Sequence, residues 1–127
     1  MISKEMFDEF FLEGIAGECR HYGRSIYHLD GPGALRHLDS ILSIPELDAV
    51  QWVPGAGRDQ CKSWMDLYKK ILAAGKSIVV YPQTKGDFLA LMDNLPAKGL
   101  CIMFNGAANE DDAKDIMKFV EKWGRSK

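Results

Sequence analysis

Four short apolar runs occur along this chain, and each of them is followed directly by polar or turn-forming residues. The runs span residues 25–29, 48–53, 77–81 and 100–104. They are rich in β-branched and aromatic side chains, which favours β-strands at this length. Because apolar residues follow one another instead of alternating with polar ones, we expect these strands to be buried on both faces.

Five other segments carry apolar residues at helical spacing. These are residues 5–20, 33–44, 59–74, 86–95 and 110–123. Ser3 and Asn109 are the expected N-caps of the first and last segments, and Gly75 follows the third as a helix terminus. The pattern therefore predicts one helix followed by four strand–helix units.

Strands that alternate with helices predict one α/β domain over residues 1–127, with a parallel sheet and right-handed crossovers. Two architectures satisfy this order. One is an open doubly wound sheet, and the other is half of a (βα)8 barrel of the TIM type. Four strands cannot close a barrel by themselves, and their free edges invite pairing. A half-barrel would therefore need a second copy or a partner chain.

Charge and cysteine content exclude several classes of partner. The formal net charge of −2 gives no reason to expect nucleic acid or an anionic membrane as a partner. No apolar run approaches the ~20 residues that cross a bilayer, and the N-terminal residues lack the apolar stretch of a signal peptide. The three cysteines are widely spaced, which indicates reduced thiols and a cytoplasmic protein.

His28 and Asp30 stand at the end of the first strand, before a Gly-Pro-Gly turn. Positions i and i+2 of a strand point to the same side, so both side chains can reach the rim where α/β proteins place their chemistry. They are candidates for a pair of metal ligands or an acid/base pair. In the structural alternative, Asp30 caps the following helix or holds the turn, and His28 hydrogen-bonds beside it.

Polar residues in or after the other strands are candidates for substrate binding. They are Gln51, Arg58, Tyr81, Gln83 and Asn105. Gln51 interrupts a buried run and needs a hydrogen-bond partner, whereas Arg58 can meet an anion. Glycines at these strand ends could cradle a phosphate, but turn geometry also explains them, and no nucleotide-binding glycine pattern is present. We expect Trp52 in the core, and His21 and His37 at the surface.

The chain resembles the C-terminal half of the uroporphyrinogen decarboxylase superfamily in two runs. Residues 27–34 read Tyr-His-Leu-Asp-Gly-Pro-Gly-Ala, and residues 47–55 read Leu-Asp-Ala-Val-Gln-Trp-Val-Pro-Gly. Residues 3–10 are similar to the helix that precedes the fifth strand of that family. The superfamily includes the corrinoid:coenzyme M methyltransferases and has the (βα)8 barrel fold. The resemblance covers nearly the whole chain but only half of a barrel, so it implies the half-barrel.

The resemblance implies two chemistries. In the methyltransferase branch, zinc binds and deprotonates a thiol, which takes a methyl group from a corrinoid-carrying partner. His28 matches a ligand histidine of that branch and Asp30 replaces a ligand cysteine, so these two residues are the implied zinc ligands. Cys101 lies within the last strand, where we expect it to pack in the core. The decarboxylase branch neutralises substrate carboxylates, for which Arg58 is the candidate at the rim.

Two functions are therefore expected. The first is an enzyme or enzyme subunit that transfers a methyl group to a thiol or removes a carboxylate, with His28 and Asp30 as catalytic groups. The second is a non-catalytic half-barrel that binds a small anionic ligand or another chain. In either case we expect a homodimer, or a complex with a chain that supplies the missing half.

Overall fold

One sheet of four parallel strands organises the structure, a computed structural model that describes residues 2–126. The strands are β1 (Ile26–Asp30), β2 (Ala49–Val53), β3 (Ser77–Val80) and β4 (Leu100–Ile102). They lie side by side in the order β1-β2-β3-β4, and every neighbouring pair is parallel. The predicted α/β fold with a four-stranded parallel sheet is confirmed.

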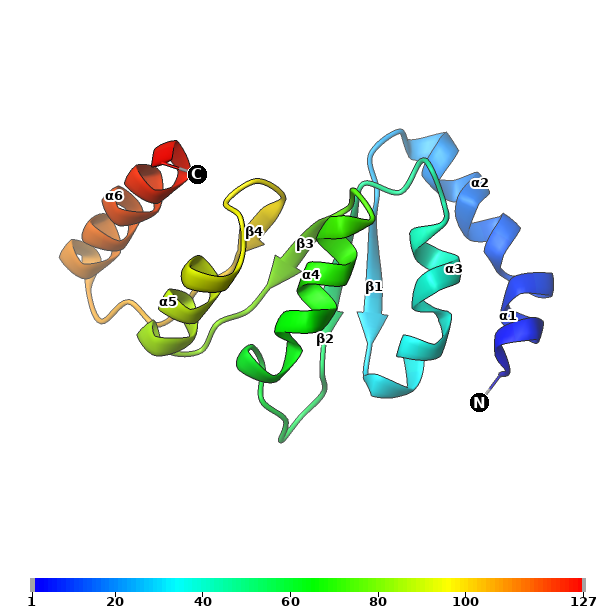
Figure 1. The fold of residues 1–127 in the computed structure, drawn as a ribbon, viewed down its shortest axis with the longest axis horizontal. Helices are drawn as coiled ribbons and strands as arrows, with labels where there is room; N and C mark the ends of the chain where they lie inside the picture. Colours follow the sequence, from blue (N-terminus) through cyan, green and yellow to red (C-terminus); the bar gives the residue numbers. More distant parts are fainter. Residues whose placement is uncertain (1, 127) are drawn as a thin grey trace.

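Helices precede the sheet and connect its strands (Figure 1). They are α1 (Lys4–Phe10), α2 (Leu12–Tyr22), α3 (Leu38–Leu42), α4 (Met65–Ala73), α5 (Lys85–Asn94) and α6 (Glu110–Ser126), with 3-10 turns η1 (Pro32–His37) and η2 (Lys62–Trp64). Ser3 caps α1 as predicted, because its side-chain oxygen accepts the amide hydrogen of Met6. The helix expected over residues 5–20 is interrupted at Phe11. The helices expected over 33–44 and 59–74 are shorter α-helices, and each is preceded by one of the two 3-10 turns.

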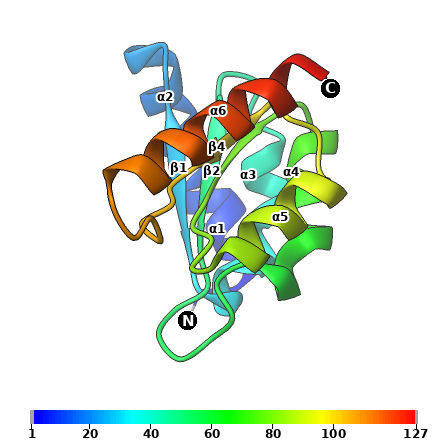
Figure 2. The same ribbon diagram turned by 90° about the vertical axis from the view of Figure 1, so that its left-hand side faces the viewer.

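The strand order bears on the two architectures that the sequence left open. A doubly wound sheet reverses its strand order part-way and places helices on both faces. Here the order follows the sequence, and α3, α4 and α5 all lie on the same side of the sheet (Figure 2). Right-handed crossovers that always move in one direction give this one-sided arrangement, which is also that of a barrel segment. Within this chain the sheet is open.

The core lies between the sheet and α3, α4 and α5. Strand residues that point toward these helices are buried, and they are Leu29, Val50, Trp52, Ile78 and Val80. Trp52 packs edge-on against Trp64 of η2, with ring centroids 4.9 Å apart, so its predicted place in the core is confirmed. From the helices, Ile71 and Leu91 are fully buried against the same side of the sheet. This face carries most of the apolar burial that stabilises the fold.

The opposite face of the sheet is not covered by the crossover helices, so the expectation that both faces are buried is wrong for the outer strands β1 and β4, whereas Ala49 and Val79 of the middle strands are buried. Alternation along the strands places Ile26, His28 and Cys101 on this face, and all three are exposed. Cys101 is therefore not a core residue. The strands read as continuous apolar runs because this uncovered face also carries apolar side chains. One of them is Val79, which lies between Gln51 and Cys101.

The two ends of the sheet are flanked by helices that differ in their packing. Figure 1 places α1 and α2 beyond β1, and α6 beyond β4. His37 packs against α1 with its ring stacked 4.3 Å from that of Phe7 and only 7% exposed, so its expected surface position is wrong. At the other end, an apolar groove of about 400 Å³ lies between α5, β4 and α6. Among residues 2–126, no helix combines the length and the hydrophobicity that spanning a membrane requires.

Two leucines of α5 test the one-sided core. Leu91 is fully buried, whereas Leu89 on the same helix is 48% exposed. We predict that Leu91→Ala lowers the free energy of unfolding by about 2–5 kcal/mol, because it leaves a cavity against the sheet. The matched Leu89→Ala variant should change it by less than about 0.5 kcal/mol. Equal losses in urea unfolding of the two variants would contradict this placement of α5.

Candidate functional site

Three polar side chains form a hydrogen-bonded row across the uncovered face of the sheet. The Nδ1 atom of His28 lies 2.7 Å from the side-chain oxygen of Gln51. The amide nitrogen of Gln51 donates a hydrogen bond to the hydroxyl of Tyr81. The row thus joins three neighbouring strands, with Gln51 in the middle. Gln51 and Tyr81 are half-buried and His28 is exposed.

Strand register explains why these three residues meet. His28 of β1 is the Cα partner of Gln51 in β2, so their side chains point to the same face. Gln51 in turn pairs with Val79, and Tyr81 lies two residues beyond Val79, just past the end of β3. The sequence-based proposal that Gln51 needs a polar partner is confirmed, because Gln51 has one on each side.

Asp30 lies next to the row but takes no part in it. It is exposed, follows His28 by two positions on β1, and its side chain makes no hydrogen bond or ion pair within residues 2–126. The turn that follows is capped without its help: Gly31 stands at the N-cap of η1, and no side chain bonds there. The structural alternative in which Asp30 caps the next helix is therefore wrong, and its carboxylate remains available to a ligand.

Arg58 lies on a loop that projects beyond the carboxyl ends of the strands (Figures 1 and 2). Gly55 and Gly57 give this loop its path, since their φ angles of 92° and 74° are ones that other residues rarely adopt. The guanidinium of Arg58 is exposed and has no partner in the described part of the chain. The loop therefore carries an unpaired cation at the end of the sheet where Asp30 and Tyr81 lie.

The remaining candidates for substrate binding have different surroundings. The side-chain amide of Gln83 donates to the backbone oxygen of Tyr81, 3.1 Å away, so it is engaged at the end of its own strand. Asn105 follows β4, is exposed, and its side chain has no partner among residues 2–126. The structure therefore brings His28, Gln51 and Tyr81 together and leaves Asn105 apart from their hydrogen bonds.

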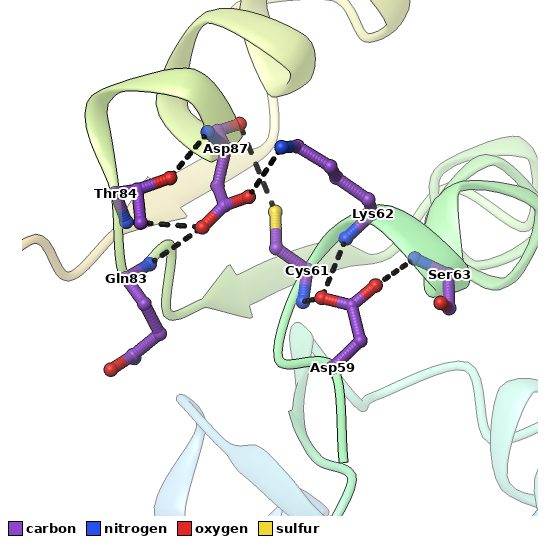
Figure 3. Close-up of polar contacts among 7 residues, drawn as sticks. All are labelled: Asp59, Cys61, Lys62, Ser63, Gln83, Thr84 and Asp87. Carbon is purple, nitrogen blue, oxygen red and sulfur yellow. Dashed lines mark hydrogen bonds and ion pairs between the residues drawn. The ribbon is translucent and has the colours of Figure 1, made fainter.

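Sequence reasoning missed the cap formed by Asp59 (Figure 3). Its carboxylate accepts hydrogen bonds from the backbone amides of Cys61, Lys62 and Ser63, with N···O distances of 3.0, 3.3 and 2.5 Å. Hydrogen bonds from Ser63 and Cys61 lower the pKa of Asp59 to about 2, because they stabilise the ionised carboxylate. This cap fixes the start of η2, and hence the base of the loop that carries Arg58.

A second missed carboxylate, Asp87, joins two loops at the same end of the sheet (Figure 3). It forms a capping box with Thr84 at the start of α5, which the Thr-x-x-Asp spacing could have indicated. The ammonium of Lys62, from the preceding strand–helix connection, lies 3.1 Å from its Oδ1 atom. Asp87 therefore clamps the loop after β2 to the loop after β3.

Cys61 lies between these two carboxylates and is completely buried. Its thiol lies 3.9 Å from the backbone oxygen of Asp87. Burial, together with the negative charges of Asp87 and Asp59, raises the pKa of Cys61 to about 12. A completely buried thiol with a raised pKa is a poor nucleophile, so the structure gives Cys61 a packing role.

The donor set for a metal is incomplete in the part of the chain that the structure describes. A catalytic zinc site takes three protein ligands and a structural one takes four. His28 and Asp30 would supply two, and no cluster of three or more His, Cys, Asp or Glu side chains suited to a metal occurs within residues 2–126. The expected zinc site would therefore need ligands from outside these residues.

No protein-family model, curated protein or solved structure matches this chain. The resemblance to the uroporphyrinogen decarboxylase superfamily therefore has no support from these comparisons.

We predict that Asp59→Asn lowers the free energy of unfolding by about 1 kcal/mol at pH 7, since it removes a charged cap. The folded-state pKa of Asp59 lies below its ordinary value, so this contribution is complete above about pH 4 and is lost as the pH falls through about 2. Urea unfolding should therefore show the difference from the wild-type chain shrinking between those pH values. Asp93→Asn, at an exposed carboxylate without a partner, is the control, and a pH-independent difference would contradict the account.

Proposed function

We propose that the uncovered face of the sheet binds a small anionic substrate and that His28 moves a proton in its reaction. The observation that carries this proposal is the hydrogen-bonded row from His28 through Gln51 to Tyr81. These side chains lie on the face that has no part in the core between sheet and helices. Parallel α/β enzymes bind their substrates near the carboxyl ends of such strands.

The unpaired guanidinium of Arg58 is the reason for proposing an anionic substrate. A guanidinium binds a carboxylate through two parallel hydrogen bonds, and this one is not engaged by any carboxylate among the described residues. Its loop leaves β2, the strand of Gln51, at the carboxyl end of the sheet. In the proposed site, Arg58 holds the anionic group and the row contacts the part of the substrate that reacts.

Two reactions fit this arrangement, and the family resemblance favours both of them. In a decarboxylation, the bond to the leaving carboxylate breaks, its electron pair stays on the substrate, and His28 delivers the proton that replaces carbon dioxide. In a methyl transfer to a thiol, His28 takes the thiol proton and the sulfur accepts the methyl group from a corrinoid-carrying partner. If His28, Asp30 and ligands from another chain held zinc instead, the metal would lower the pKa of that thiol, and a base other than His28 would take its proton.

The uncovered face gives the proposed site only one wall, so we propose that association completes it. In a (βα)8 barrel, one helix lies outside each pair of neighbouring strands. Here α3, α4 and α5 fill three such positions, and α2 and α6 flank the free edges. A complementary half with four strands and three helices would complete the ring. A second copy would bring two helical segments to each junction, so a homodimer requires α2 or α6 to shift.

A non-catalytic role as a binding module is the second candidate. Its specific support is the exposure of large apolar side chains at both ends of the sheet. At the β1 end Tyr22 and Ile26 are exposed, and at the α6 end Met117 is exposed beside the apolar groove. Such surfaces are typical of sites that contact another chain.

We propose a cytoplasmic location for either function. The three cysteines are free thiols in this structure, and two of them, Cys19 and Cys61, are buried. Free thiols are typical of proteins from reducing compartments.

We predict that Arg58→Ala weakens the binding of succinate, a simple dicarboxylate probe, by about threefold to tenfold. The loss corresponds to one charge-assisted contact at an exposed site. Shifts of amide resonances in two-dimensional NMR during a titration measure the affinity and report whether residues of β1, β2 and β3 respond.

Arg125→Ala is the matched control, because it removes an exposed arginine from the far end of α6. Its affinity for succinate should equal that of the wild-type chain. The proposed anion site would be wrong if both variants bound succinate equally well, or if the shifts avoided the uncovered face.

A further inference from the structure

We infer that Gln51 is a positioning residue that fixes the tautomer of His28 and the direction of the Tyr81 hydroxyl, and so sets the polarity of the ligand. This inference rests on the proposed function, because it assigns a ligand class to the same row. It goes further in stating which end of the row accepts a hydrogen bond from the ligand and which end donates one.

The contact between His28 and Gln51 determines where the imidazole proton lies. The atom facing Nδ1 is the amide oxygen of Gln51, 2.7 Å away. An amide oxygen only accepts hydrogen bonds, so Nδ1 must carry the hydrogen. In the neutral ring, Nε2 then holds the lone pair and is the proton acceptor. The neutral His28 therefore offers a base to a ligand on this face, and its Nε2 can deliver a proton only after it has taken one up.

The other end of the row has the opposite polarity. The amide nitrogen of Gln51 donates to the hydroxyl oxygen of Tyr81, which occupies acceptor capacity on that oxygen. The hydroxyl hydrogen of Tyr81 is then directed away from Gln51 and is available to a ligand. If the amide of Gln51 were reversed, both ends would change together. One side chain therefore controls both groups.

The position of Gln51 suits this role. It stands on β2, between the strands of its two partners, and its Cα partners are His28 on one side and Val79 on the other. It is half-buried, while His28 is exposed, so the amide is the more sheltered part of that contact. Bonds on both sides oppose rotation of the amide, because a rotation would break two hydrogen bonds at once.

The polarity defines a class of ligand. It must present an ionisable proton to His28 Nε2 and an acceptor oxygen, carboxylate or carbonyl, to Tyr81. β1 and β3 are two strand spacings apart, which is about 10 Å. In the reaction, a bond between hydrogen and a carbon, sulfur or oxygen atom of the ligand breaks, its electron pair stays on the ligand, and a new N–H bond forms at His28. The Tyr81 hydroxyl stabilises the negative charge on the acceptor oxygen.

The nitrogen resonances of the histidine side chains test this inference without any ligand. In the ¹⁵N-labelled wild-type chain at about pH 9, where imidazoles are neutral, we expect His28 with hydrogen on Nδ1. His21 and His37 are internal references. Gln51→Leu removes the acceptor, so we expect the His28 tautomer to shift toward the Nε2-protonated form that free imidazole side chains prefer. Gln51→Glu keeps an acceptor, so the Nδ1-protonated form should persist.

Hydrogen on Nε2 of His28 in the wild-type chain would overturn the inference directly, whether or not the variants fold. An unchanged tautomer in folded Gln51→Leu would overturn the positioning role. These results are separate from those of the proposed function. If Arg58→Ala and the wild-type chain bound succinate equally while the tautomer behaved as expected, the anion site would fail and the role of Gln51 would stand.

Discussion

The rest of the structure depends on the one-directional path of the chain through its parallel sheet. Each crossover moves to the next strand in the same direction, so α3, α4 and α5 gather on one side and bury that face. The same path leaves the other face without a helical cover. The uncovered face is free to bind ligands or partners. The apolar burial that stabilises the sheet lies mostly on the other face.

The one-directional path of the chain also determines the geometry of the proposed site. Strand pairing places His28 beside Gln51, and side-chain alternation directs both to the uncovered face. The loops beyond the strands are held by carboxylates: Asp59 caps the turn after β2, and Asp87 ties that turn to the start of α5 through Lys62. A rigid sheet and clamped loops thus support a polar row whose members each have a defined hydrogen-bond role.

The sequence predicted the elements, the parallel sheet and the shared face of His28 and Asp30, because strand alternation is a local property. It failed where long-range contacts decide. Cys101 was expected in the core because a short apolar run looks the same whether one or both faces are covered. His37 was expected at the surface because nothing local indicates its stacking on Phe7. The Thr84 and Asp87 capping box was visible in the sequence, but its ion pair with Lys62 was not.

The most direct test of the uncovered face is the number of thiols that react in the native chain. Cys101 is exposed on that face, whereas Cys19 and Cys61 are buried. With a water-soluble thiol reagent at low protein concentration, the account predicts that one thiol reacts rapidly and that two react only on unfolding. Rapid labelling that spares Cys101, or protection of all three thiols in the dilute native chain, would contradict it.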